Sequence, residues 1–241
     1  MKTLTQPLSV SLALTLAAAC GGGSAQSEPQ TPASSAKAEE VDYYNPDVRM
    51  MAEVGALPEQ AVVDAFQEAL PDLQRCWQEG VSRVEFLGGE IEFYIKVNHA
   101  RQVAHIHAQR SSIGDRNTEL CMFDVLRSAS WPAPVDGKVG IATNSFAFEM
   151  YGDVRPPAVW DGGRVSETMT ELEPQLGECK GGRGGQFTAT LYVDTDGSVM
   201  GASVTPPDES GEDAVDCLVG ALREAAYESP GSWPAKVSFY L

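Results

Sequence analysis

The sequence predicts an α+β protein built from two tandem two-layer units, each with two helices packed on one face of a three-stranded antiparallel sheet. One observation is an internal repeat, because Cys121 and Cys217 lie 96 residues apart (217 − 121). Another is the order of periodicities in each half, which reads helix, strand, strand, helix, strand. The same offset aligns further identical residues: Val97 with Val193, Val103 with Val199, Leu126 with Leu222, and Ala129 with Ala225. One ancestral unit has therefore been duplicated.

The first element of the first copy is a helix that Pro58 opens. Apolar residues follow at steps of three and four, as on one face of a helix: Val62, Phe66, Leu70 and Leu73. Pro71 predicts a kink or a restart, because proline removes a backbone donor and clashes with the preceding turn. The helix is expected to end by Gly80, with Cys76 on its last turn.

Two strands, a second helix and a closing strand follow. Apolar and polar residues alternate from Ile91 to Val97, and a second strand covers 103–108. The next helix carries Cys121 inward, and the closing strand covers 144–150, with its counterpart at 236–241 in the second copy. Because a helix separates the second strand from the third, we expect the strand order 2-1-3. That order places both closing strands at a sheet edge.

The first twenty residues resemble a lipoprotein signal that ends at Cys20. Lys2 precedes an apolar run from Leu8 to Ala19. This run of about a dozen residues is shorter than the roughly 20 that a spanning helix needs. We expect cleavage before Cys20 and lipidation of its thiol, which would anchor the protein permanently. The alternative is an ordinary signal peptide that contains a cysteine.

Composition divides the chain into five segments. A signal peptide (1–19) precedes a tether (20–50) that is rich in Ser, Ala, Pro, Gln and Glu and has almost nothing to bury. The first repeat (51–150) and the second repeat (164–241) are joined by a linker (151–163). Each repeat is small enough that its core alone gives marginal stability.

The charge balance argues against nucleic-acid binding. The chain has 17 Lys and Arg against 34 Asp and Glu, a net charge of −17. Such a surface repels both phosphate backbones and anionic lipid. We therefore expect contact with a membrane only through the lipid anchor.

Cysteine parity favours disulfides. Five cysteines leave an odd member unless lipid consumes Cys20, and the other four are Cys76, Cys121, Cys179 and Cys217. An exported chain meets an oxidising environment, and no C-x-x-C pair is present to form a zinc knuckle. Disulfides are therefore a better interpretation than a metal site.

These residues resemble the C-terminal domain of TonB-like energy transducers, and more closely its two-cysteine version in myxobacterial adventurous gliding motility proteins. The resemblance rests on the cysteine that ends each first helix, the turn VDTDGSV, the helix with the second cysteine, and WPAP before the last strand. It covers about 58–150 and 164–241. It implies a partner-binding module of the cell envelope without catalysis.

We expect the disulfides to form within each copy, Cys76 with Cys121 and Cys179 with Cys217. The alternatives are a Cys121–Cys217 bridge or four free thiols. Pairing within copies would close loops of about 45 and 38 residues, each contributing roughly 4 kcal/mol if the bridge acts by restricting the unfolded chain.

No catalytic set emerges from the sequence. His105 and His107 project to the same side of a strand, where Glu92 could join them around a metal ion. The second copy has no histidine, so we interpret these side chains as solvent-facing. The turn Asp194–Gly197 lacks the glutamate that a calcium loop requires. The four tryptophans are expected in the core, with Trp160 a candidate for lining a groove between the repeats.

The sequence thus predicts a non-enzymatic cell-envelope lipoprotein, anchored in the outer membrane and facing the periplasm, that needs no cofactor. It would present two disulfide-stapled modules that bind an envelope protein by sheet-edge pairing, as a scaffold or accessory subunit. The alternative is a lipoprotein that binds a small ligand or a metal, in the groove between the repeats or on the His105/His107 strand.

Overall fold

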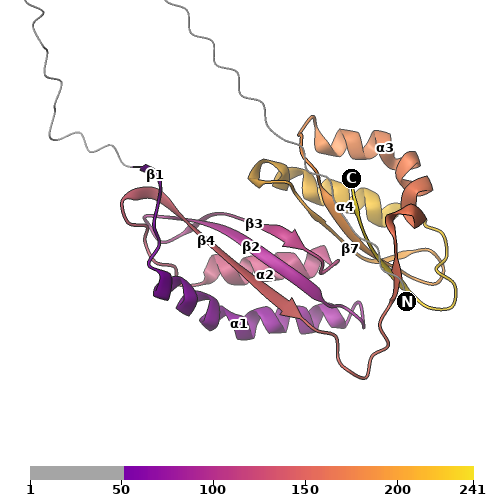
Figure 1. Cartoon of the computed structure of the whole chain (residues 1–241), viewed down its shortest axis with the longest axis horizontal. Helices are drawn as coiled ribbons and strands as arrows, with labels where there is room; N and C mark the ends of the chain where they lie inside the picture. Colours follow the sequence, from indigo (N-terminus) through magenta and orange to yellow (C-terminus); the bar gives the residue numbers. More distant parts are fainter. Residues whose placement is uncertain (1–51) are drawn as a thin grey trace, which may run out of the picture. The chain divides into compact units, whose positions relative to one another are not determined.

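The computed structural model describes residues 52–241, and their fold is α+β (Figure 1). The predicted signal peptide, Cys20 and the tether up to residue 50 lie outside the described residues. The fold class is confirmed: two sheet-and-helix units follow one another along the chain.

The first repeat contains two helices and a four-stranded sheet. In chain order its elements are β1 (Ala52–Gly55), α1 (Glu59–Val81), β2 (Gly89–Asn98), β3 (Val103–Ser111), α2 (Arg116–Ser128) and β4 (Gly137–Phe148). The sheet order is β1-β4-β2-β3, and α1 and α2 lie on the same face of it (Figure 1).

The second repeat has the same order of elements with two short 3₁₀ helices added. Its elements are β5 (Ala158–Trp160), η1 (Gly162–Val165), α3 (Ser166–Lys180), β6 (Thr188–Val193), β7 (Val199–Thr205), η2 (Glu209–Gly211), α4 (Glu212–Glu224) and β8 (Ala235–Tyr240). The sheet order is β5-β8-β6-β7.

Each sheet differs from the prediction by one strand. The expected order 2-1-3 is present as β3-β2-β4 and β7-β6-β8, but β1 and β5 add a fourth strand parallel to β4 and β8. The sheets are therefore mixed rather than purely antiparallel. Strands of four and three residues are too short to show a period of two in the sequence.

The helix α1 runs through Pro71 without interruption, so the expected restart is wrong. Proline removes one intrahelical donor, but the apolar face of α1 continues past it into the core, where Leu73 and Cys76 are buried. Packing of this face holds the helix together across the missing bond.

The hairpin turns support the duplication. Arg101 and Gly197 are separated by the same 96 residues as Cys121 and Cys217, and both have a positive φ, 61° and 87°. At Gly197 a side chain would also meet the backbone of Tyr227, since a Cβ added there would lie 2.2 Å from its carbonyl oxygen. Only glycine fits that turn, whereas the first copy accommodates an arginine.

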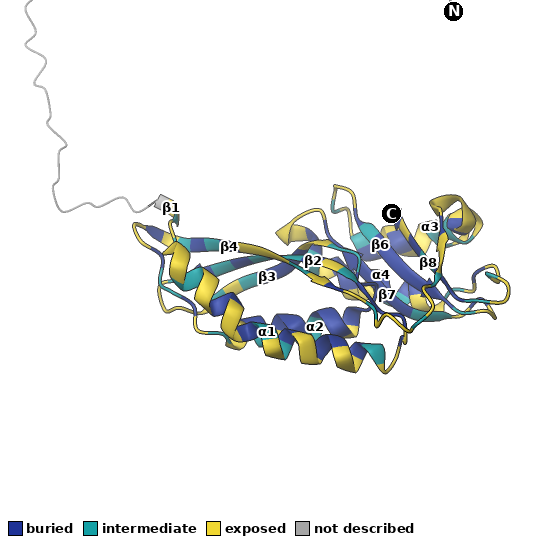
Figure 2. Cartoon of the chain, turned by 60° about the horizontal axis from the view of Figure 1, so that its bottom comes forward, coloured by how far each residue is buried: buried dark blue, intermediate teal, exposed yellow. Residues whose placement is uncertain are grey.

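Both cores lie between a sheet and its helices. The inward residues of β2 are fully buried: Ile91, Phe93, Ile95 and Val97. Figure 2 shows the same division on α1, whose buried face turns to the sheet and whose outer face is exposed. Disulfides Cys76–Cys121 and Cys179–Cys217 join the two helices of each repeat, in the expected pairing.

The two repeats share one junction. Tyr192 on β6 is fully buried and belongs to the core of the first repeat, not the second. Its hydroxyl donates to Gly88 O at 3.1 Å and accepts from Gly88 N at 3.3 Å. On α2, Arg116 donates to Glu212 and Asp216 of α4, each at 2.8 Å. The described residues, 52–241, accordingly belong to one compact unit.

Candidate peptide-binding groove

The closing strand of the first repeat is only partly covered. β4 spans Gly137–Phe148, but β1 pairs with it only as far as Gly140. Residues 141–148 therefore pair with β2 on one side and have no neighbouring strand on the other, among the residues that the structure describes.

The register shows which backbone groups face that open side. Glu90 O accepts from Ser112 N, and Asn98 N donates to Gln102 O, so even-numbered residues of β2 bond toward β3. Odd-numbered residues of β2 then bond to β4, where the register runs without a break and pairs them with even-numbered partners. The N–H and C=O groups of Thr143 and Ser145 consequently point to the open edge.

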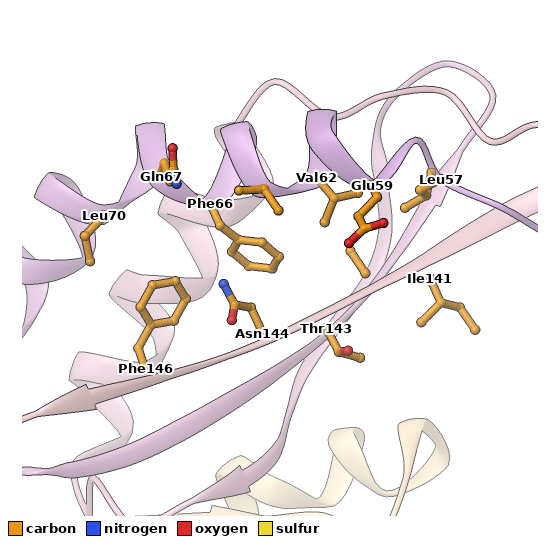
Figure 3. Close-up of a pocket in the computed structure, with 12 residues that line it drawn as sticks. Leu57, Glu59, Val62, Phe66, Gln67, Leu70, Ile141, Thr143, Asn144 and Phe146 are labelled. Carbon is orange, nitrogen blue, oxygen red and sulfur yellow. The ribbon is translucent and has the colours of Figure 1, made fainter.

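A groove lies between this edge and α1. It has a volume of about 490 Å³, and Figure 3 shows Val62, Phe66 and Leu70 of α1 turned toward β4. Phe66 packs on Phe146, with ring centroids 5.8 Å apart. The lining is mostly apolar and comes from the β1–α1 connection, α1 and β4: Leu57, Val62, Val63, Phe66, Leu70, Ile141, Ala142 and Phe146.

Few polar side chains line the groove. Asn144 stands at an inward position of β4, between Ala142 and Phe146, and it is exposed because the groove opens above it. Its Oδ1 accepts from Ser145 N at 2.9 Å, which occupies one of the outward donors. Glu59 is the one charged residue in the lining, and its carboxylate turns toward β4 (Figure 3).

The corresponding edge of the second repeat is covered. Val97 pairs with Gly140 and its counterpart Val193 with Ala235, so β4 and β8 correspond at an offset of 95 (235 − 140). β5 pairs with Ala235–Val237, which correspond to 140–142 of β4 at this offset. Gly162 of η1 lies beside Phe239. The expectation of an open edge at 236–241 is therefore wrong for most of the strand, because β5 and η1 occupy it.

The histidine strand is not solvent-facing, and that expectation is corrected. His107 is buried and His105 is half-buried, with His105 Nε2 2.9 Å from His107 Nδ1. Burial, together with the neighbouring His105, lowers the pKa of His107 to about 4. Sequence alone could not show this, because Glu209, which covers this face, lies about a hundred residues away in the chain.

The metal hypothesis finds no support in the described residues. Glu92 pairs with Arg110 at 2.7 Å instead of joining the histidines. Glu209 pairs with Lys96 and lies 3.9 Å from His105. Within 52–241 no group of three His, Cys, Asp or Glu side chains is arranged to hold a metal ion.

A second cavity, of about 670 Å³, lies where the repeats meet the linker. Lys236 lines it and donates to Gly88 O at 2.7 Å and Ser112 O at 2.6 Å. Burial lowers the pKa of Lys236 to about 8. Trp160 does not line this cavity, because it is buried in the second core. Trp77 and Trp131 are buried in the first core, against which Trp233 also packs.

Comparison with other proteins does not assign this site to a family. No family model, curated protein or solved structure matches the chain. No helix in the described range 52–241 is long and apolar enough to cross a membrane.

The sequence did not indicate that α1 forms the wall of a groove whose floor is β4. The prediction placed the closing strand at 144–150, so it found only the last part of β4 (Gly137–Phe148) and missed 141–143 of the floor. It treated Val62, Phe66 and Leu70 only as one apolar face of a helix. One signal was available: Asn144 interrupts the inward apolar positions Ala142, Phe146 and Phe148. A polar residue at an inward position indicates that the face is open to water there.

Proposed function

We propose that the protein binds an envelope protein partner by adding an extended segment of that partner to the open edge of β4. The observation that carries this proposal is the uncovered stretch 141–148 beside an apolar groove. Unpaired strand groups give affinity by main-chain hydrogen bonds, and an adjoining groove gives specificity by taking alternate side chains.

The proposal keeps the non-enzymatic interpretation. The groove contains no nucleophile beside a base and no pair of carboxylates, but it does contain the features of a peptide site. The resemblance to the TonB C-terminal domain and the lipoprotein-type signal at Cys20 support a place in the cell envelope, anchored by lipid in the outer membrane and facing the periplasm. Of the two closing strands, only β4 keeps an uncovered stretch long enough for strand addition, which favours one such site per chain.

The test uses matched proline substitutions in the fragment 42–241, which contains the whole compact unit. Thr143 and Ser238 are equivalent at the offset of 95, and both direct their N–H away from the central strand. Thr143→Pro removes a free edge donor, so we expect capture of envelope proteins to fall at least tenfold. Ser238→Pro acts where β5 lies alongside, so capture should persist.

Circular dichroism and thermal unfolding check that both proline variants fold. Thr143→Val, which keeps the N–H, should capture the same proteins as the wild type. Equal capture by the folded Thr143→Pro variant and the wild type would refute strand addition at β4.

A second candidate function is supported by Lys236. The ammonium group is largely buried, and no carboxylate lies within ion-pair distance of it in the described chain. An apolar acid could place its carboxylate beside Lys236 in the 670 Å³ cavity. Titration with the anionic apolar dye 8-anilinonaphthalene-1-sulfonate tests this, and unchanged dye binding by Lys236→Met would exclude the site.

A further inference from the structure

The charge of the β4 groove restricts the kind of segment that can dock there, an inference that rests on the proposed function. Glu59 is the one charged group of the lining, and Figure 3 shows its carboxylate inside the groove. No Lys, Arg or His of the described residues lies within ion-pair distance of Glu59. A docked segment would remove water from this carboxylate, which costs free energy unless a cation replaces the water.

The spacing of the wall restricts the apolar part of the segment. Val62, Phe66 and Leu70 are four residues apart on α1, so they recur about every 6 Å along the helix. Side chains on the same face of a strand recur every two residues, about 6.6–6.8 Å apart. Two alternate apolar side chains of a docked strand would therefore match the two hollows between the three wall residues.

The groove is closed at the end where Glu59 lies. Leu57 lines that end and contacts Gly140, since a Cβ added to Gly140 would lie 2.5 Å from the Leu57 side chain. β1 occupies the strand position beyond it. The residue that meets Glu59 is therefore the one that enters the closed end of the groove.

The chain itself is a poor occupant. The tether (20–50) contains two basic residues, Lys37 and Arg49, against five acidic ones, so it is itself acidic. A second copy would bring another acidic chain to the same edge, and each copy has a net charge of −17. Charge complementarity instead favours a basic segment from another protein.

We propose that the partner segment is basic: it places a Lys or Arg opposite Glu59 at the closed end of the groove and apolar residues at alternate positions along β4. Arg suits this position particularly well, because its planar guanidinium binds a carboxylate through two parallel hydrogen bonds.

The experiment selects phage-displayed random peptides on the fragment 42–241. Peptides selected on the wild type should be enriched in Lys or Arg at one position and in apolar residues at alternate positions. The best peptide is then synthesised with its basic residue and with Glu in its place. We expect the Glu peptide to bind the wild type at least tenfold more weakly and to recover on Glu59→Lys, whereas the basic peptide loses affinity on that variant.

Control variants separate this inference from the proposed function. If Thr143→Pro abolishes peptide binding but Glu59→Lys leaves the charge preference unchanged, the inference of a basic partner segment is wrong. Strand addition to β4 is then still supported. If the selected peptides bind Thr143→Pro as well as the wild type, or if no peptide is selected, both proposals fall. Glu59 is exposed, so neither Glu59→Lys nor Glu59→Gln removes buried contacts.

Discussion

The two repeats share one topology but treat the edge of the closing strand differently. In the first repeat β4 has 12 residues and β1 reaches only Gly140, whereas in the second repeat β8 has six residues and β5 reaches Val237. The wall also differs, because α1 has 23 residues and α3 has 15. A short extension of β4 and a longer helix thus give one copy a groove that the other lacks.

The second repeat uses the outer face of its sheet for a different contact. Tyr192 on that face inserts into the core of the first repeat, and Lys236 reaches Gly88 and Ser112. After duplication, the first repeat has kept an uncovered edge on its closing strand, and the second repeat packs against the first repeat. The following variants test this division, beginning with the largest expected effect.

Tyr192→Ala should destabilise the protein most. Loss of a fully buried aromatic ring costs about 3–5 kcal/mol of unfolding free energy. Leaving the buried Gly88 N–H without its partner adds about 1–3 kcal/mol, whereas Gly88 O keeps its hydrogen bond from Lys236. Denaturant unfolding should also change from one transition to two, as the repeats lose their shared core.

Two variants control for this result. Tyr192→Phe keeps the ring and should lose only the hydrogen-bond contribution. Tyr240→Ala alters an exposed ring on the same sheet and should change stability by less than about 0.5 kcal/mol. A single unshifted transition in Tyr192→Ala would show that the repeats do not depend on each other.

Removing either disulfide should cost about 4 kcal/mol, because the bridges close similar separations of 45 and 38 residues. The effect on binding should differ. The Cys76→Ala/Cys121→Ala pair releases α1, which forms the groove wall, whereas Cys179→Ala/Cys217→Ala changes helices away from the groove. Only the first pair should weaken partner capture when measured at a temperature where both variants are folded.

The sequence predicted what depends on local pattern and repetition. The helices, the long strands and the disulfide partners follow from periodicity and from the offset of 96 residues. β1 and β5 were missed because three or four residues show no period. The burial of His107 was missed because Glu209 and its neighbours reach that strand only through the tertiary fold.

The groove could be predicted from the sequence only in part. Its floor, β4, was predicted as an edge, and Asn144 marks where that floor is open. Its closed end depends on Leu57 contacting Gly140, a contact across more than 80 residues that no local pattern encodes. The covered edge of the second repeat was likewise unpredictable, since it required the position of β5.

The pH dependence of the unfolding free energy tests the comparison next, because two buried titrating groups of the first repeat have non-titrating counterparts at the offset of 96. His107 corresponds to Ser203, and Glu119 corresponds to Val215. The pKa of His107 is lowered to about 4, mainly by burial, so the unfolded state binds more protons between pH 4 and 6.5. This group alone makes the unfolding free energy rise with pH across that range.

Glu119 has the opposite effect. Burial raises its pKa to about 7, so the folded state binds more protons between pH 4.5 and 7, and the unfolding free energy falls as pH rises. The two contributions oppose each other in the wild type. Glu119→Gln should leave only the rise and His107→Gln only the fall, as measured by urea unfolding from pH 4 to 7.5. Parallel profiles for the two variants would contradict these assignments.

Asn144→Trp should have the smallest effect on stability and still abolish binding. Asn144 is exposed and lines the groove beside Phe66 and Phe146, so a tryptophan there can lie in the groove without entering the core. We expect a change in unfolding free energy within about 0.5 kcal/mol. Partner capture should fall at least tenfold, because the indole occupies the space that alternate side chains of a docked strand require.

The equivalent substitution in the second repeat is not a fair control, because its counterpart Phe239 is buried. Asn144→Asp is the better one, since it keeps the size and still offers an oxygen to Ser145 N. It should retain binding, and a second carboxylate in the same groove as Glu59 should strengthen the preference for a basic segment. Full capture by Asn144→Trp would place the partner outside the groove and leave the open edge of β4 without a role in binding.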